Sequence, residues 1–87
     1  MQLLCRNDID DFARWKAVFD ADREAQGAAG LSLLQLWRED GDPNRVWFLF
    51  EVNDRDKAQA FMDAPNARLH ADRAGVRDGE YHFVRTA

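Results

Sequence analysis

The chain has 87 residues, of which 46% are hydrophobic and 32% charged. This composition is typical of a globular protein rather than a disordered one, and the length supplies one core, so we expect a single domain over residues 1–87. The formal net charge of −4 argues against nucleic acid or an anionic membrane as a partner, because both require a basic face on the protein.

Localisation follows from three further features of the sequence. No stretch approaches the roughly 20 apolar residues of a membrane span, and the N-terminus MQLLCRND lacks the basic and apolar regions of a signal peptide. Cys5 is the only cysteine, which excludes an intrachain disulfide. We therefore expect a reducing, cytoplasmic setting.

The first half of the chain predicts a strand, a helix and a second strand. An apolar run at residues 2–6 predicts a strand that stops at Asn7 and Asp8. Apolar side chains recur every three or four residues, which is typical of a helix with one buried face. They are Ile9, Phe12, Trp15 and Phe19, and they predict a helix from Asp10 to Gln26. Gly27 and Gly30 predict the end of this helix, and residues 31–39 predict a strand.

The second half predicts the same pattern again. Residues 40–44 (DGDPN) form a turn that leads into a strand at 45–52, so the two strands make a hairpin. A helix follows from Asn53 or Asp54 to about Met62, and Pro65 separates it from a short helical piece at 66–74. Gly75 and Gly79 flank a loop before a closing strand at 80–86. The predicted order is βαββαβ, with two βαβ halves.

A short motif, Asn-Asp-x-Asp, occurs at Asn7 and again at Asn53. Asn and Asp side chains accept hydrogen bonds from the free N–H groups of a first helical turn, so we interpret both copies as helix starts, with Asp10 and Asp56 at the positive end of the helix dipole. The alternative, a calcium loop, requires a carboxylate at position 12 and a glycine at position 6.

The spacing argues against calcium in both places. Counted from Asp8, position 12 is Phe19. In DGDPNRVWFLFE the acceptors Asp40, Asp42, Asn44 and Glu51 stand at suitable positions, but position 6 is Arg45. No His, Asp and Glu spacing suggests a transition-metal site, and GAAG at 27–30 follows a helix rather than opening one, unlike a phosphate loop.

The central hairpin is apolar on both faces. Side chains alternate along a strand, so Val46, Phe48, Phe50 and Val52 share one face, with Trp47, Leu49 and Glu51 on the other. By the same alternation, Leu34 and Leu36 share one face of the preceding strand, and Leu31, Leu33 and Trp37 share the opposite face. Two helices cover only one side of a four-stranded sheet. We therefore expect a second copy to cover the other, in a homodimer.

The segments DFARWKAVFDADREAQGAAGLSLLQLWRE and DPNRVWFLFEVNDRDKAQAFMDAP resemble the dimeric α+β barrel superfamily. They are most similar to its small bacterial members, the antibiotic-biosynthesis monooxygenase-like or cyclase-like proteins. The resemblance implies an α+β fold: a ferredoxin-like protomer with an antiparallel four-stranded sheet, helices on one face, and a barrel formed across the dimer. It also implies a ligand cavity between sheet and helices. Members range from enzymes to proteins without known activity.

His70 is the first candidate for a catalytic residue. The haem-degrading branch of the superfamily shapes its pocket with an Asn near the first strand, a Trp, and a His on the later helix. Asn7 and His70 fall near the first and last of these places, but Phe61 stands near the Trp place. This departure makes haem binding or degradation the less favoured interpretation, and we expect no cofactor.

Tyr81 and His82 are the next candidates, because a phenol or a neutral imidazole beside an aromatic substrate can move a proton. Alternation along the strand predicts that one of the two points toward the helices and the other toward the barrel interior. The competing interpretation is a polar position on an edge strand. Cys5 lies in an apolar strand, and we expect a buried, inert thiol.

The remaining candidates lie on the central hairpin and the last strand. Cofactor-independent oxygenases of the superfamily bind a polycyclic phenol with Trp, Asn, Tyr and Arg side chains, and this chain has the same residue types without matched positions. Stabilising the substrate anion requires a cation in a dry pocket, which Arg38 or Arg85 could supply. Trp37, Trp47 and Glu51 are candidate ligand contacts, with core packing the competing interpretation for both tryptophans.

We therefore predict a homodimer that binds a small hydrophobic or aromatic molecule. The leading hypothesis is a cofactor-independent monooxygenase or cyclase that acts on an aromatic or polyketide-like substrate. The rival hypothesis is a non-catalytic ligand-binding or structural dimer. An enzyme should gather Arg, His and Tyr around an apolar cavity, whereas a structural dimer should fill that space with Phe and Leu.

Overall fold

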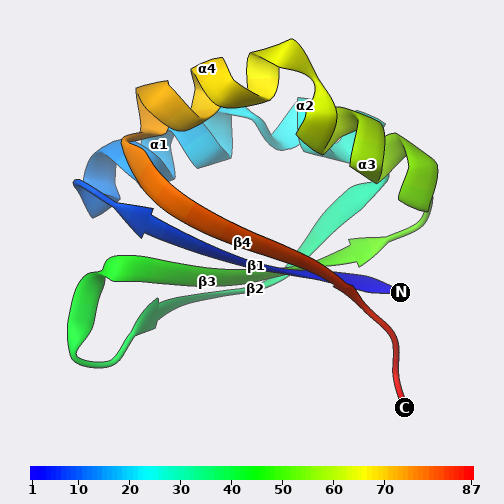
Figure 1. Cartoon of the computed structure of the whole chain (residues 1–87), viewed down its shortest axis with the longest axis horizontal. Coiled ribbons are helices and arrows are strands. Elements are labelled where there is room, and N and C mark those ends of the chain that lie inside the picture. The colour runs from blue at the N-terminus through cyan, green and yellow to red at the C-terminus, as the bar shows by residue number, and fades with distance from the viewer.

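The computed structural model describes residues 1–87. Along the chain lie β1 (Gln2–Ile9), α1 (Phe12–Ala21), α2 (Arg23–Ala28), β2 (Leu31–Glu39), β3 (Asp42–Val52), α3 (Arg55–Asp63), α4 (Pro65–Ala74) and β4 (Val76–Val84). The strands form one antiparallel sheet in the order β2-β3-β1-β4. All the helices lie on one face of this sheet, and the other face carries none (Figure 1). The α+β, ferredoxin-like arrangement predicted from the sequence is confirmed.

Each predicted helix is divided or shifted in the structure. The helix predicted from Asp10 to Gln26 is two helices, α1 and α2, that meet at Asp22. Gly27 lies inside α2 and does not end it. The turn into β2 is made at Gly30, whose φ of 77° favours glycine. A Cβ at this position would lie 2.3 Å from the Asn53 side chain, so the close approach also requires glycine.

The first and last strands of the chain are longer than their apolar runs. β1 continues to Ile9, because it pairs with β3 on one side and with β4 on the other. β4 begins at Val76, which places Gly79 inside the strand rather than in a loop. The hairpin turn is also tighter than predicted, since β3 begins at Asp42 and Gly41 has a φ of 85°.

The two Asn-Asp-x-Asp motifs occupy different structural positions. Asp54 caps α3 as predicted, and its side chain accepts a hydrogen bond from the Lys57 N–H at 3.0 Å. The prediction for the first copy is wrong: Asn7 and Asp8 are paired residues of β1. Asp11 caps α1 instead, accepting from the Arg14 N–H at 2.9 Å. The strand extends past the motif because it has neighbours on both sides to pair with.

A bulge in β2 changes which side chains face the helices. The pairing with β3 shifts between Leu33 and Gln35, so Leu34 is an extra residue. After the shift Leu36 pairs with Phe48, and Trp37 pairs with Trp47. The alternation predicted for β3 is confirmed, whereas the prediction that Leu33 and Trp37 share a face is wrong. Trp37 joins Trp47 on the face without helices, which stays apolar in its centre.

The core lies between the sheet and the helices. It holds 13 buried apolar residues, with Leu3 and Cys5 from β1 and an aromatic group at its centre. In this group Trp15 stacks on Phe19 with ring centroids 4.6 Å apart, and Phe19 meets the edge of Phe48 at 5.2 Å. No helix of the chain has the length and apolar character needed to cross a lipid bilayer.

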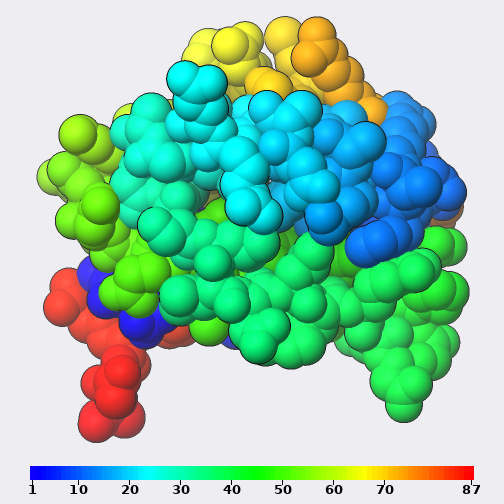
Figure 2. All heavy atoms as spheres, turned by 180° about the vertical axis from the view of Figure 1, so that it is seen from behind, coloured from blue at the N-terminus to red at the C-terminus, as the bar shows by residue number.

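The Arg14 side chain joins the helical segment before the hairpin, α1 and α2, to the segment after it, α3 and α4. Its Nε donates to the Arg73 carbonyl at 2.7 Å and its Nη2 to the Asp72 carbonyl at 2.9 Å. These carbonyls belong to the last turn of α4, which leaves its final C=O groups without partners in the helix. Seen from behind, the α1–α2 segment lies over β2 with α3 and α4 rising beyond it (Figure 2). The two hydrogen bonds of the Arg14 side chain therefore hold α1 against α4.

Candidate ligand cavity

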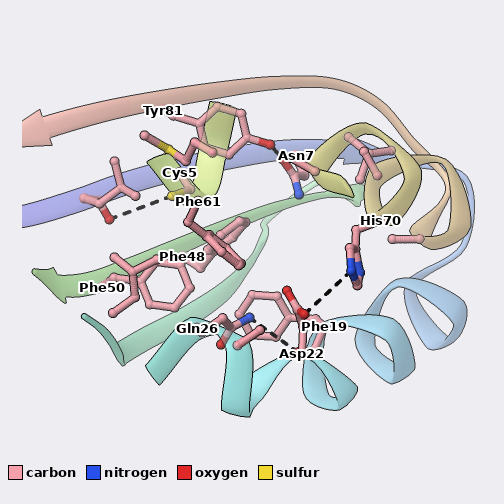
Figure 3. Close-up of a pocket in the computed structure, with 18 of the residues that line it drawn as sticks. Cys5, Asn7, Phe19, Asp22, Gln26, Phe48, Phe50, Phe61, His70 and Tyr81 are labelled. Carbon is pink, nitrogen blue, oxygen red and sulfur yellow. Dashed lines mark hydrogen bonds and ion pairs between the residues drawn. The ribbon is translucent and has the colours of Figure 1, made fainter. Parts of the chain in front are cut away.

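A cavity of about 600 Å³ lies between the helices and the covered face of the sheet (Figure 3). Of its 25 lining residues 18 are hydrophobic, and they come from the strands and from every helix. Among them are Leu3, Trp15, Phe19, Phe48, Phe50 and Phe61. Its size and apolar walls are those of a site for a small organic molecule. The space is open, so the core does not fill it with Phe and Leu side chains.

Three residues form a hydrogen-bonded group on the sheet wall of this cavity. Asn7 is 6% exposed, and its amide lies 2.8 Å from the Tyr81 hydroxyl and 3.1 Å from Trp15 Nε1. The Trp15 indole is 1% exposed and can only donate. Therefore the amide oxygen of Asn7 faces Trp15, because the opposite orientation leaves a buried N–H without an acceptor, at a cost of about 1–3 kcal/mol.

This orientation satisfies the whole Asn7 side chain. Its nitrogen donates to the Arg6 carbonyl at 2.9 Å and to the Tyr81 hydroxyl at 2.8 Å. Tyr81 Oη is then an acceptor toward Asn7. Burial raises the pKa of Tyr81 above its ordinary value, so the hydroxyl keeps its proton at neutral pH.

Gly79 provides the space that the Tyr81 ring occupies. The two residues are neighbours on one face of β4. A Cβ on Gly79 would lie 2.8 Å from Tyr81 Oη and 3.0 Å from the atom of the Asn7 amide that faces Tyr81. The bare backbone at Gly79 therefore permits the contact between Tyr81 and Asn7.

His70 lines the cavity from α4, opposite Asp22 at the junction of α1 and α2. His70 Nε2 lies 3.9 Å from Asp22 Oδ1, and Nδ1 is enclosed without a hydrogen-bond partner. A carboxylate beside Nε2 favours the tautomer with its proton on that nitrogen, which leaves Nδ1 as a proton acceptor. His70 Nδ1 is therefore available to accept a proton, although Asp22 is too far from Nε2 for a hydrogen bond that would orient the ring.

The cavity walls contain acids but no Lys or Arg. Asp22 and Asp63 are the carboxylates, and the Gln59 amide of α3 already donates to Asp63 at 3.1 Å. A haem group carries two propionates that require cationic or N–H partners. Although Asn7, Phe61 and His70 all line the cavity as the resemblance implied, this donor set does not fit haem. A neutral ligand suits the cavity better.

Cys5 lines the cavity floor but is not a nucleophile. Burial raises the pKa of its thiol to about 12, because an apolar environment disfavours the thiolate. The thiol makes a long contact of 3.9 Å with the Leu3 carbonyl. The predicted burial of the thiol is confirmed. No group of three or more His, Cys, Asp and Glu side chains is arranged to hold a metal ion.

Several residues predicted for the site lie elsewhere. Arg38 stacks 4.2 Å over the Phe12 ring and donates to the Pro43 carbonyl, outside the cavity. His82 pairs with Leu4, on the face without helices, and Tyr81 alone of the two points toward the helices. Trp37, Trp47 and Glu51 also lie on that open face and belong to neither cavity nor core.

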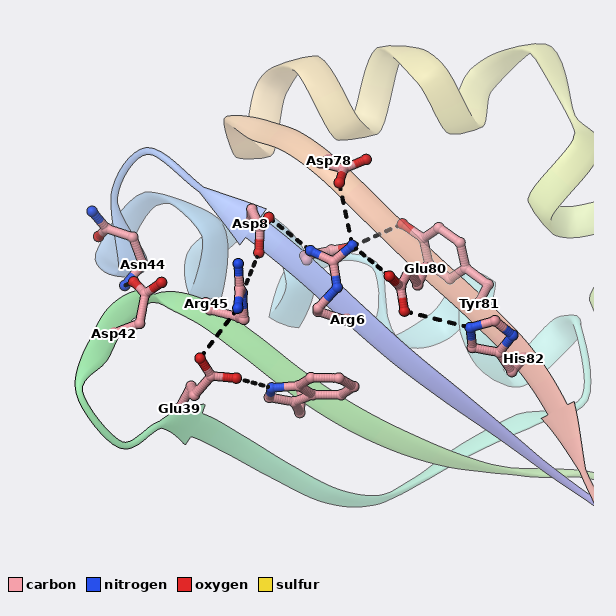
Figure 4. Close-up of polar contacts among 12 residues, drawn as sticks. Arg6, Asp8, Glu39, Asp42, Asn44, Arg45, Asp78, Glu80, Tyr81 and His82 are labelled. Carbon is pink, nitrogen blue, oxygen red and sulfur yellow. Dashed lines mark hydrogen bonds and ion pairs between the residues drawn. The ribbon is translucent and has the colours of Figure 1, made fainter.

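The open face of the sheet carries a chain of ion pairs around Arg6 (Figure 4). Arg6 is only 8% exposed and contacts the carboxylates of Asp8 at 2.7 Å, Glu80 at 3.0 Å and Asp78 at 3.2 Å. Hydrogen bonds from Arg45 and Arg6 hold the pKa of Asp8 below its usual range. Arg6 and Arg45 are thus both engaged by carboxylates, which outnumber them on this face.

Solved structures of other proteins share this architecture. A Bordetella bronchiseptica protein named as an antibiotic biosynthesis monooxygenase superposes with a TM-score of 0.78 at 14% identity, covering 99% of this chain and 95% of that one. SnoaB, a cofactor-independent oxygenase from Streptomyces nogalater, superposes with a TM-score of 0.70 at 19% identity, covering 99% and 93%. The chain has the antibiotic biosynthesis monooxygenase-like fold.

Other proteins with this fold differ in what is known of them. An uncharacterized NIPSNAP domain protein from Burkholderia xenovorans superposes with a TM-score of 0.66 at 18% identity, covering 100% of this chain and 95% of that one. Comparison with protein-family profiles and with curated protein sequences finds no match. At identities this low, the superpositions establish the fold but not the activity, which depends on the residues of the cavity.

The sequence analysis missed three residues of the cavity. The sequence predicted that Trp15 lies on the buried face of a helix, but it did not predict the hydrogen bond between Trp15 and Asn7. Gln26 is 5% exposed and donates to the Phe19 carbonyl at 3.4 Å. In the single helix predicted from the sequence, its position seven residues after Phe19 falls on the same face, which is a usable signal. Asp22 has no such signal, because its role depends on a turn between two helices.

Proposed function

We propose that the chain binds a small, neutral, apolar or aromatic molecule in the cavity between its sheet and helices. The cavity itself carries this proposal: about 600 Å³ of open space with mostly hydrophobic walls. Its few polar groups include His70 on α4, and Asn7 and Tyr81 on the sheet (Figure 3). This combination of apolar walls and a few fixed polar groups is typical of sites for small molecules.

We further propose that the working form is a homodimer in which the open faces of two sheets pack together. Trp37 is 44% exposed on that face and pairs with Trp47 across β2 and β3. The Arg6 cluster supports the proposal as well, because its charges already have partners at 2.7–3.2 Å, which lowers the cost of removing them from water.

The enzymatic form of the proposal is a cofactor-independent oxygenation or cyclisation of an aromatic substrate. SnoaB, with the same fold, is named as a cofactor-independent oxygenase. In this chain His70 Nδ1 is free to accept a proton, with Asp22 beside the other ring nitrogen. Arg38 lies outside the cavity, so no cation stabilises a substrate anion there, and deprotonation rests on His70.

The test is calorimetric titration with 1-naphthol, followed by measurement of dissolved oxygen. We expect binding to the wild type, and oxygen consumption that the His70→Ala variant loses while it still binds. His82→Gln is the matched control, because the second histidine lies on the opposite face of the sheet. This control should consume oxygen like the wild type.

Two results would change the proposal. Binding without oxygen consumption by the wild type would leave the non-catalytic, ligand-binding alternative. Absence of binding by 1-naphthol and by other neutral aromatic molecules of similar size would overturn the function altogether and favour a purely structural dimer.

A further inference from the structure

The polarity of the hydrogen bond between Asn7 and Tyr81 decides what Tyr81 offers to a ligand. Trp15 Nε1 requires an acceptor, so the Asn7 oxygen faces it at 3.1 Å and the Asn7 nitrogen faces Tyr81 Oη at 2.8 Å. That nitrogen donates and the hydroxyl oxygen accepts. The Tyr81 proton is therefore not used by Asn7, which is the only side chain within hydrogen-bond distance of the hydroxyl.

Two other amides of the cavity are engaged, whereas the Asn66 amide on α4, away from the sheet wall, makes no hydrogen bond within the protein. The Gln26 amide donates to the Phe19 carbonyl at 3.4 Å, and the Gln59 amide donates to Asp63. His70 Nε2 faces the Asp22 carboxylate. Among the groups that line the wall of the sheet, the Tyr81 hydroxyl thus has a free proton, with its oxygen held by a buried amide and its ring placed over Gly79.

We propose that Tyr81 is the specificity-determining residue of the cavity and that it selects ligands with an acceptor oxygen, such as an aromatic ketone or quinone. Asn7 is its positioning residue, because its amide is engaged by Arg6, Trp15 and Tyr81 and fixes the hydroxyl as a donor. The raised pKa of Tyr81 supports this role, since the hydroxyl stays protonated at neutral pH. The inference rests on the proposed binding function and adds the class of ligand.

The experiment uses two ligands of nearly the same shape, 2-acetylnaphthalene and 2-ethylnaphthalene. They differ in the carbonyl oxygen that would accept from Tyr81. We expect the wild type to bind the ketone more tightly and Tyr81→Phe to weaken ketone binding about three- to tenfold, the range of one neutral hydrogen bond. The affinity for 2-ethylnaphthalene should not change, because the Phe ring keeps the apolar contact.

Asn7→Asp tests the positioning role with Tyr81 intact. A carboxylate in this position still accepts from Trp15, but it also accepts the Tyr81 proton and so withdraws it from the ligand. We expect the preference for the ketone to fall as it does in Tyr81→Phe. The carbonyl stretching band of bound 2-acetylnaphthalene gives an independent readout, because a hydrogen bond lowers its frequency. Both variants should return the band to its position without a hydrogen bond.

The possible outcomes distinguish a failure of the role inferred for Tyr81 from a failure of the proposed binding function. If both ligands bind equally and Tyr81→Phe changes neither affinity nor carbonyl band, the role of Tyr81 is overturned while the cavity proposal stands. If neither ligand binds the wild type, both proposals fail. Should Asn7→Asp fail to fold, Tyr81→Phe with the paired ligands still decides the role of Tyr81.

Discussion

Gly79 controls the position of Tyr81 at the wall of the cavity. The sequence predicted it as a flank of a loop, but it lies within β4 and its backbone supports the Tyr81 ring. Glycine normally weakens a strand because it has no side chain to pack. Here the missing Cβ leaves room for an aromatic neighbour two residues further along.

We expect Gly79→Ala to destabilise the protein by about 1–3 kcal/mol, the usual cost of overpacking. The new methyl group would lie 2.8 Å from Tyr81 Oη, so the ring has to leave Asn7. Urea denaturation at a fixed protein concentration measures the free energy of unfolding.

Gly27→Ala is the matched control for this substitution. Gly27 lies in α2, and a methyl group added there would have nothing within 4 Å. Alanine is the better helix former, so this variant should gain about 0.5–1 kcal/mol. Equal effects of the two substitutions would contradict the role of Gly79.

At the level of the elements, α4 depends on a residue of α1. Arg14 donates to the carbonyls of Asp72 and Arg73 at the C-terminal end of α4. A cation there interacts favourably with the helix dipole and adds hydrogen bonds to the carbonyls of the last turn, of which that of Asp72 also accepts from the Gly75 N–H. Because α4 carries His70, this contact also holds one wall of the cavity.

We expect Arg14→Ala to lower the free energy of unfolding by about 1 kcal/mol, since it removes a cation from a helix C-terminus. Hydrogen exchange should show the amides of α4 opening more readily while those of β1 keep their protection. Lys16→Ala is the control on the same helix. It removes only the exposed pair with Asp20 at 2.6 Å, and should cost about 0.3–0.5 kcal/mol. Unchanged exchange in α4 of Arg14→Ala would refute the contact's role.

Over the molecule as a whole, the helices cover one face of the sheet and leave Trp37 and Trp47 on the other (Figure 1). Trp37 is 44% exposed and pairs with Trp47, and apolar surface of this kind is typical of protein interfaces. The proposed dimer buries this surface, so a charge placed within it should prevent association.

Trp37→Glu should therefore sediment as a single 10.1 kDa chain, whereas the wild type should sediment as two. Leu69→Glu is the control, because Leu69 is 60% exposed on α4, among the helices. That variant should remain a dimer. A wild type that sediments as one chain at micromolar concentration would remove the dimer proposal.

Local patterns in the chain were enough to predict the order and type of the elements and the two-sided hairpin. Apolar residues every three or four positions predict helices, and alternation in β3 predicts its buried face. Both predictions are confirmed, because burial against a sheet follows the same repeat. The antiparallel sheet followed from the hairpin and from the resemblance to a known fold.

The boundaries that depend on neighbouring strands became visible only in the folded molecule. β1 extends to Ile9 because β3 and β4 supply partners on both sides, which moves the helix cap from Asp8 to Asp11. After the bulge at Leu34, the side chains of β2 lie on the faces opposite to those predicted relative to Leu31 and Leu33. Neither feature has a local signal, since pairing joins residues that lie far apart along the chain.

The arrangement of the cavity also became visible only in the folded molecule. Asn7, Trp15 and Tyr81 come from a strand, a helix and the last strand, and their roles follow from hydrogen bonds made across the core. The sequence supplied His70, Tyr81, Asn7 and Phe61 as candidates, but it also supplied Arg38 and His82, which lie outside the cavity. The direction of a side chain relative to a cavity depends on packing, and packing is a property of the whole fold.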